Sequence, residues 1–300
     1  MEKQKNITAI IGPKGGVGKT TISANLAIAL SQTGKRVIAL DLDLGASNLH
    51  AVFGIRDSKY TLDDFVQNRV KNLADIVLDT DIPNVRIICG GDIPGIANMS
   101  YQKKMKLIRH IAGLDGDFVI LDLAPGAAYN VADFSIIAQK SLLVTTPEVP
   151  SLMNVYGFIK SALFRRLNFI FKYKKSPELL ELLETARAPD NHPDLKTMEG
   201  FFQKAFEIDS AVAASAKKNI SNFKPFVLVN RVRTKKDARA GEVIQNIMKQ
   251  YLSIECTMIM TIREDEAVGD SIARLKPIMI HAPDSPFSMD LKEIAARLCP

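Results

Sequence analysis

The sequence has only three cysteines and four histidines, and neither set forms a recognisable metal site. Cys89, Cys256 and Cys299 lie far apart and include no C-x-x-C pair. The histidines show no spacing typical of metal ligands either. These absences predict a protein of a reducing cytoplasm that needs no structural metal and no disulfide to complete its core.

Long apolar runs are also missing. No window approaches the roughly 18 to 20 uninterrupted apolar residues that a membrane-spanning helix requires. The segment of residues 1–6 is short and charged and leads directly into the run Ile7–Ile11. It lacks the long apolar region of a signal peptide. We therefore expect a cytoplasmic protein, whose contact with a membrane or with the nucleoid is peripheral.

What the sequence does contain is a regular alternation of short apolar runs and longer helical stretches. With 300 residues, of which 47% are hydrophobic, the chain is long enough for one large α/β domain. The runs are Ile7–Ile11, Val37–Asp41, Val85–Cys89, Phe118–Leu121, Leu142–Thr145, Phe226–Val229, Thr257–Met260 and Ile278–Ile280. This rhythm predicts a doubly wound, mostly parallel sheet with helices on both faces, in a single domain over residues 1–300.

One stretch interrupts the alternation. Between about 165 and 222 no run resembles a strand, and helices are expected around 177–186, 198–206 and 209–219. We interpret this stretch as a helical insertion between two strands. A last helix is expected over 285–298, with apolar residues at helical spacing that pack against the sheet.

A phosphate-binding loop follows the first strand. Residues 12–21 read GPKGGVGKTT, which fits the pattern G-x-x-x-x-G-K-[ST] between a strand and a helix. Gly15, Gly16 and Gly18 allow backbone conformations in which successive N–H groups, including that of Val17, point into one concavity. The start of the following helix adds a partial positive charge, so this loop is predicted to cradle the phosphates of a nucleotide.

The residues that close this loop carry the expected chemistry. Lys19 is placed to reach the β- and γ-phosphates, and the Thr20 hydroxyl to ligate Mg²⁺. Thr21 is placed for the α-phosphate. ATP and Mg²⁺ are therefore the predicted cofactors.

The segment Lys14-Gly-Gly-Val-Gly-Lys-Thr carries a second lysine ahead of the glycines. In this it resembles the deviant Walker A ATPases of the MinD/ParA family, a group of SIMIBI-type P-loop NTPases. The sequence of residues 41–55 is most similar to that of the MinD and FlhG-like branch. The resemblance implies that Lys14 reaches the phosphates held by a partner subunit, so that ATP binding and homodimerisation are coupled.

The second strand ends in Asp41-Leu42-Asp43, and alternation along it directs both aspartates to the same side, near the phosphate loop. The resemblance assigns Asp43 the positioning of the attacking water, so Asp43 joins Lys14 and Lys19 as a predicted catalytic residue. Asp41 is expected either in the magnesium shell or as support for the loop.

A further apolar run ends in Asp122 and a Pro-Gly turn, as a Walker B strand does before a second switch. Asp122 is expected to hold Mg²⁺ through water. Gly126 is placed for its backbone amide to sense the γ-phosphate, and its conformational freedom would let the switch rearrange.

The base is expected between two later segments. Asn230 and Arg231 resemble the Asn-Arg segment with which this family binds adenine, since an amide both donates to and accepts from the adenine edge. The loop after the last run, which contains Pro283, is expected to close the other side of the base. Asn230 as a simple turn residue is the alternative.

The resemblance implies an ATP-dependent dimeric switch for spatial organisation, such as cell-division, flagellar or chromosome positioning, that hydrolyses ATP slowly until an activating protein partner completes the site. It covers residues 7 to about 160 and 225–298. The expected departures are the absence of an N-terminal activating extension, of a helix-turn-helix extension and of a basic amphipathic tail. A Mrp-type carrier is disfavoured because paired cysteines are missing, and an ATP-dependent ligase because no acceptor pocket is visible in the sequence.

The charge of the chain is regional. Residues 151–250 contain 18 Lys and Arg against 10 Asp and Glu. This excess indicates either a solvated surface or a patch for nonspecific DNA or an anionic membrane. The candidate residues are Arg231, Arg233, Lys235, Lys236 and Arg239, or the stretch 165–175 with Phe164, Phe169, Ile170 and Phe171 inserted into lipid.

Overall fold

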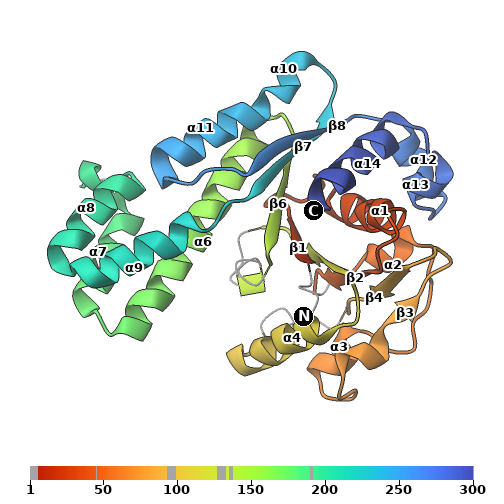
Figure 1. The fold of residues 1–300 in the computed structure, drawn as a ribbon, viewed down its shortest axis with the longest axis horizontal. Helices are drawn as coiled ribbons and strands as arrows, with labels where there is room; N and C mark the ends of the chain where they lie inside the picture. Colours follow the sequence, from red (N-terminus) through yellow and green to blue (C-terminus); the bar gives the residue numbers. More distant parts are fainter. Residues whose placement is uncertain are drawn as a thin grey trace.

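The computed structural model describes residues 6–44, 46–92, 99–126, 133–134, 138–189 and 192–299. Its centre is a sheet in the order β3-β4-β2-β5-β1-β6-β7-β8, in which every pair is parallel except β3 with β4 (Figure 1). The strands are β1 (Asn6–Ile11), β2 (Val37–Leu42), β3 (Leu78–Asp79), β4 (Val85–Ile88), β5 (Phe118–Leu123), β6 (Lys140–Thr145), β7 (Phe226–Val232) and β8 (Met258–Arg263). The predicted doubly wound, mostly parallel sheet is confirmed.

The helices lie on both faces of this sheet. Those before the long helix α6 are α1 (Lys19–Ser31), α2 (Leu49–Val52), α3 (Leu62–Val66), η1 (Leu73–Ile76) and α4 (Tyr101–Gly113). Those from α6 onward are α6 (Val149–Lys174), α7 (Pro177–Arg187), η4 (Pro193–Leu195), α8 (Met198–Ile208), α9 (Ser210–Ser221), α10 (Lys235–Ala238), α11 (Ala240–Leu252), α12 (Ala267–Ala273), α13 (Ile278–His281) and α14 (Pro286–Leu298).

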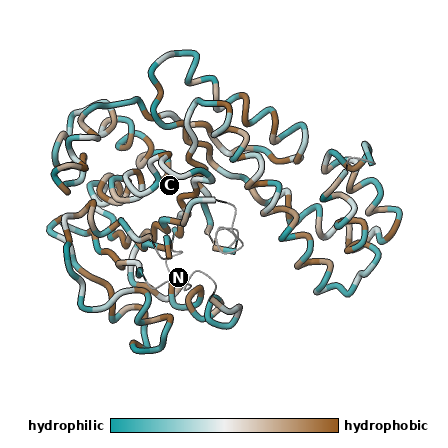
Figure 2. Tube along the Cα trace, turned by 180° about the vertical axis from the view of Figure 1, so that it is seen from behind, coloured by the Kyte–Doolittle hydropathy of each residue, from teal (hydrophilic) through white to brown (hydrophobic). Residues whose placement is uncertain are grey.

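The central strands are apolar on both sides because helices cover both of their faces. In β1, Ala9 and Ile11 belong to the core beneath α3, α4 and α6, whereas Ile10 between them belongs to the core beneath α1 and α14. Figure 2 shows these inner strands as mostly hydrophobic. Continuous apolar runs, rather than alternating ones, are the pattern expected of a parallel sheet buried on both faces.

Two strand predictions need correction. The run Ile278–Ile280 is not a strand but part of the short helix α13. Pro277 precedes it, and the Pro277 carbonyl accepts hydrogen bonds from the backbone N–H groups of Ile280 and His281. A short apolar run does not distinguish strand from helix by its periodicity alone. The strand β3 was not predicted, since only two residues pair there, antiparallel to β4.

Helix α6 links the sheet to a group of helices that lies away from it (Figure 1). Its 26 residues correspond to about 39 Å at 1.5 Å per residue. The described residues of the predicted insertion are mostly helical, and α7, α8 and α9 lie within two residues of the expected ranges. We refer to α7, α8, α9 and the second half of α6 as the helical extension. Its treatment as an insertion into a single domain stays a prediction.

None of the helices in the described part of the chain combines the length and the apolar character that a membrane span needs.

Candidate functional site

The phosphate loop joins β1 to α1, as the motif predicts. Gly16 and Gly18 have φ values of 77° and 95°, in the left-handed region that favours glycine. Gly18 is the N-cap of α1, and no side chain caps the helix there and no acidic residue stands in its first turn. The first N–H groups of α1 are therefore available to an anion rather than satisfied by the helix itself.

Lys19 lies over the loop rather than in solvent. Its side chain belongs to the buried polar set at 7% exposure. A Cβ built on Gly12 would come within 2.5 Å of Lys19 Cγ, so the absence of a side chain at Gly12 makes room for the lysine stem. The stem is thus held by packing before any ligand arrives, which reduces the side-chain entropy lost on binding.

Asn230 and Arg231 hold the loop from the opposite side. The Asn230 side-chain amide donates to the Val17 carbonyl at 2.8 Å, and Arg231 Nη2 donates to the Gly16 carbonyl at 2.9 Å. Arg231 has a φ of 60°, and the pairing of β7 with β8 shifts register between Val229 and Val232. This irregularity turns both side chains toward the loop. Asn230 thus lies beside the loop, and one donor of its amide already serves the loop backbone. Its contact with adenine stays a prediction.

We expect Gly18→Ala to destabilise the protein more than an ordinary glycine replacement does. A Cβ on Gly18 would lie 2.5 Å from Asn230 Nδ2, and the left-handed φ would be strained as well. The expected loss in free energy of unfolding is about 2 to 3 kcal/mol in urea titrations. Gly34→Ala is the control, since Gly34 also has a positive φ but open space around it, and about 1 kcal/mol is expected. Equal losses for the two variants would contradict the contact.

Asp122 is, like Asp41, an almost fully buried carboxylate of the site. It lies on β5 at 1% exposure, and Ser23 Oγ of α1 donates to its Oδ1 at 2.9 Å. Among the described residues, its Oδ2 is buried without a hydrogen-bond partner. Burial, followed by the charge of Asp41, raises the pKa of Asp122 to about 7, against the opposing effect of Thr20, Ser23 and Lys19. A buried carboxylate oxygen without a donor, with a threonine hydroxyl nearby, fits a hard cation such as Mg²⁺.

Asp41 lies directly beside Asp122, because the two are register partners on β2 and β5. Its Oδ1 accepts from the Asp43 N–H at 2.9 Å. Its Oδ2 accepts from Ser47 Oγ at 2.7 Å and from the N–H groups of Asn48 and Leu49 at 3.0 Å. Of the two roles expected for Asp41, these contacts support the one in which it holds the loop. Gly45, in the middle of this loop, lies outside the described residues.

Asp43, directly after β2, has fewer hydrogen bonds among the described residues than Asp41 within it. It is half-buried, and burial together with the charge of Asp41 raises its pKa while Lys19 lowers it. The structure therefore brings Asp43 into the electrostatic range of Lys19 and Asp41. A carboxylate that stays partly accessible beside the phosphate loop is in a position to contact a water molecule there.

The other predicted residues lie at the rim. Lys14 is exposed, and its charge contributes to lowering the pKa of Glu148, after the larger effect of Thr146. Gly126 has a φ of 94° in open space, three residues beyond the end of β5. Thr21 is half-buried in the first turn of α1.

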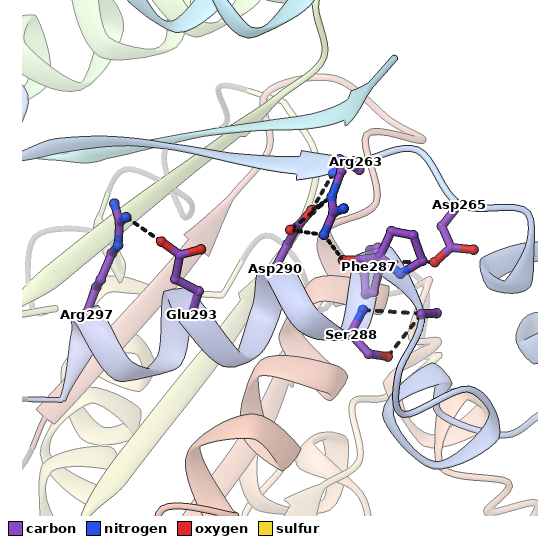
Figure 3. A network of polar contacts seen from close by, with 9 residues as sticks. Arg263, Asp265, Phe287, Ser288, Asp290, Glu293 and Arg297 are labelled. Atoms are coloured by element: carbon purple, nitrogen blue, oxygen red, sulfur yellow. Dashed lines mark hydrogen bonds and ion pairs between the residues drawn. The ribbon is translucent and has the colours of Figure 1, made fainter. Parts of the chain in front are cut away.

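Pro283 belongs to a loop that is fixed to α14. Its carbonyl accepts from Lys292 Nζ at 2.7 Å. The start of α14 is held by Arg263 with Asp290 and by the Phe287 N–H with Asp265, as Figure 3 shows. Because α13 replaces the predicted strand, this loop does not follow the sheet directly. In the described residues no recorded bond joins Pro283 to the phosphate loop, so its contact with a base stays a prediction.

Some residues of the site were not predicted. Ser23, one turn after Thr20, binds Asp122, and Ser47 binds Asp41. The i, i+3 spacing from Thr20 is a signal that would have found Ser23. Two long-range contacts could not be predicted from local sequence, since Arg165 and Lys104 both bind Asp133. Arg165 Nε lies 2.5 Å from Oδ1, and Lys104 Nζ lies 2.5 Å from Oδ2. All three cysteines are free.

The comparisons with known proteins point to a family of nucleotide-binding domains. Residues 8–278 match the family described as the CobQ/CobB/MinD/ParA nucleotide binding domain. The antiactivator FleN of Pseudomonas aeruginosa is 35% identical over 157 residues, covering 51% of this chain and 55% of FleN. The septum site-determining protein MinD of Thermotoga maritima is 30% identical over 148 residues, covering 49% of this chain and 54% of that protein.

The chain spans about half the length of these curated relatives. Over nearly its whole length it also resembles the structure of MinD from Pyrococcus horikoshii OT3, which is described as complexed with Mg-ADP. The TM-score is 0.64 at 21% identity, over 99% of this chain and 96% of that one. At this identity the likeness shows a shared fold.

Proposed function

Because this chain belongs to the CobQ/CobB/MinD/ParA nucleotide-binding family, we propose that it is a molecular switch that binds ATP and hydrolyses it to ADP and phosphate. The observation that carries this proposal is the pairing of a buried Lys19 with a buried Asp122 whose Oδ2 has no donor in the described residues. A lysine at a helix N-terminus and a buried carboxylate able to bind a cation are parts that phosphoryl transfer requires.

Each residue has a proposed task. The N–H groups of residues 15–21 bind phosphate oxygens, and Lys19 neutralises charge on the β- and γ-phosphates. Asp122 and Thr20 would hold Mg²⁺, which supplies further positive charge to the phosphates when bound. Asp43 orients the water that attacks the γ-phosphorus as the bond to the β-phosphate oxygen breaks. Gly126, at the second switch, donates its N–H to the γ-phosphate.

We further propose that the active form is a homodimer joined through Lys14. The loop exposes this lysine, while Val149 and Met153, in the first turns of the neighbouring α6, are 69% and 50% exposed. Apolar side chains beside an unburied charge are suited to an interface that forms when a second loaded subunit supplies phosphates. The nucleotide would then determine the oligomeric state, as in a positioning switch that an activating protein partner resets.

We expect Lys14→Ala to abolish ATP-dependent dimerisation while leaving ATP binding within about twofold. The reason is that Lys14 gains an anionic partner only across the interface. Sedimentation of each variant with and without ATP and Mg²⁺ measures the mass. The exposed Lys71, which lies outside the phosphate-loop motif, provides the control Lys71→Ala. If Lys14→Ala still dimerised with ATP, the cross-subunit role would be wrong.

A surface-bound scaffold is the second candidate function, and one exposed cluster favours it. Lys235, Lys236 and Arg239 are exposed on and beside α10. Arg233 is paired with Glu264, and Arg231 holds the loop. These exposed cations follow Arg231 within eight residues, so the nucleotide state of the loop would control their contact with DNA or anionic lipid.

The structure corrects the proposed lipid insertion. Phe164 and Phe171 are 7% and 0% exposed, so they belong to the core rather than to a membrane-facing surface. Ile170 is half-buried, and only Phe169 is exposed.

One set of measurements separates the candidate functions. ATP hydrolysis and molecular mass are measured with and without duplex DNA and anionic vesicles, at two salt concentrations. Hydrolysis with ATP-dependent dimerisation supports the switch. Binding of DNA or vesicles without any hydrolysis would overturn the switch in favour of the scaffold.

A further inference from the structure

The outer side of α6 carries two large aromatic side chains that the fold leaves exposed. Phe169 is 61% exposed and Tyr173 is 76% exposed. They are four residues apart on one helix, so they lie on the same face, and Lys172 lies beside them. The opposite face of α6 supplies Leu167 and Phe171, both fully buried, to the core of the helical extension. We call Phe169, Lys172 and Tyr173 the α6 stripe.

The segment that carries the stripe is strongly basic. Residues 165–175 contain five Lys and Arg and no Asp or Glu. Arg165 and Arg166 are used within the protein, on Asp133 and on the Asn219 side chain. Lys172, Lys174 and Lys175 are exposed, and no ion pair is recorded for them in the part of the chain that the structure describes. The negative end of the α6 dipole accounts for lysines at this end of the helix, but it does not account for the exposed aromatics.

We propose that the α6 stripe is a docking site for an acidic amphipathic segment of another protein. Exposed aromatic side chains next to cations are the composition of surfaces that bind protein partners, with aromatic anchors in the centre and charges around them. A helix with apolar residues on one side and Asp or Glu on the other matches both properties at once.

The neighbourhood favours a narrow acidic segment over an anionic membrane. Helix α7 turns back beside α6 directly after the stripe, and it exposes Glu178, Glu181 and Glu184. An anionic surface broad enough to meet both helices would also meet these acids, at an electrostatic cost. A single helix along α6 meets the lysines without covering α7.

The stripe is connected to the nucleotide site through Arg165 on the same helix. Arg165 lies four residues before Phe169 on the same face, and it binds Asp133 with two nitrogens, at 2.5 and 2.6 Å. Asp133 follows Gly126 by seven residues in the chain. A partner on the stripe therefore contacts the helix face that holds the chain just beyond the second switch. A resulting change in ATP hydrolysis rests on the proposed function; docking itself does not.

The test uses a labelled synthetic peptide of about 18 residues with Leu at helical spacing and Glu elsewhere. Its binding to the full chain is followed by fluorescence anisotropy without nucleotide. Two further probes are a scrambled peptide of the same composition and vesicles of phosphatidylserine and phosphatidylcholine. We expect binding of the ordered peptide, weakened by salt, at least about tenfold tighter than binding of the scrambled one.

The variants locate the site. We expect binding of the peptide to weaken by about tenfold or more in two variants. One combines Phe169→Ser with Tyr173→Ser, and the other is Lys172→Glu. Ile272→Ser removes a 53% exposed apolar side chain from α12 and serves as the matched control, with no expected change. Because all these side chains are exposed, thermal unfolding should be the same for every variant.

Equal binding of the ordered and scrambled peptides would overturn the proposal. So would unchanged binding in both stripe variants, or vesicle binding that the stripe variants abolish while the peptide does not bind. The last result would assign the stripe to a membrane. Because the peptide is measured without nucleotide, a chain that failed to hydrolyse ATP would refute the proposed function and leave this docking test intact.

Discussion

Lys19→Ala is expected to lower ATP hydrolysis by on the order of a thousandfold, because it removes the charge that contacts the transferring phosphoryl group. The Lys19 side chain is already buried over Gly12, so its charge is held in place before ATP binds. A flexible lysine on the surface could not replace it. Phosphate release measured with saturating ATP and Mg²⁺ gives the turnover number. Nucleotide affinity, measured separately with a fluorescent ATP analogue, is expected to weaken as well.

The comparison that makes this result informative is with Lys35→Ala, which removes a lysine shortly after α1 and outside the loop. That variant should retain the activity of the unmodified chain. A Lys19→Ala protein that stayed within about tenfold of the unmodified rate would contradict the assignment of the phosphate loop as the site of hydrolysis.

Asp122→Asn is expected to have opposite effects on activity and on stability. Activity should fall by about a hundredfold or more, since the variant loses the charged oxygen that would hold Mg²⁺. Stability of the nucleotide-free and metal-free protein at pH 8 should rise by about 2 to 4 kcal/mol. If Asp122→Asn inactivates the site and stabilises the fold, the Asp122 charge serves ligand binding and not the stability of the protein.

The pH dependence follows from the raised pKa. Folded Asp122 has a pKa of about 7, whereas the unfolded chain has one near 3.8, so the folded state holds this proton more tightly. Below about pH 4 both states are protonated and the group makes no difference to stability. As the pH rises from about 4 to 7 the unfolded state alone loses the proton, and folding stability falls by the amount of the pKa difference. Above about pH 7 that loss is complete.

Urea titrations from pH 5 to pH 8 measure this behaviour. The unmodified chain without Mg²⁺ should lose more stability over this range than Asp122→Asn does. Mg²⁺ with ADP should reduce the difference, because a bound cation favours the ionised carboxylate. Asp115→Asn is the control, because Asp115 is an exposed acid that lies near the start of the same strand, and it should change neither activity nor the pH profile. Identical pH profiles for Asp122→Asn and the unmodified chain would contradict the raised pKa.

The sequence predicted most of the sheet because its central strands are apolar on both faces. Seven of the eight predicted runs correspond to β1, β2, β4, β5, β6, β7 and β8. The eighth, Ile278–Ile280, failed because three apolar residues after a proline suit a buried helical turn as well as a strand. The strand β3 has only two residues, and no local pattern distinguishes so short a pairing from a loop.

The site divides in the same way. Gly16, Gly18 and Lys19 were predictable because a contiguous motif fixes their mutual positions. Ser47 was not, because its bond to Asp41 depends on how the loop after β2 folds back. The Arg165 to Asp133 contact joins residues 32 positions apart in the chain, and its detection needs the path of α6. Local chemistry can be read from sequence, whereas contacts between distant elements require the fold.

The central place of β1 has a consequence for how the protein is made. Its two neighbours in the sheet, β5 and β6, are Phe118–Leu123 and Lys140–Thr145, so both edges of the first strand stay unpaired until about half of the chain has left the ribosome. At about 5 to 20 residues per second, this interval lasts on the order of ten seconds. During it an apolar strand is open to wrong partners. The nascent chain therefore carries its phosphate loop on a strand that is made first but gains its second neighbour only after β2 has gained both of its own.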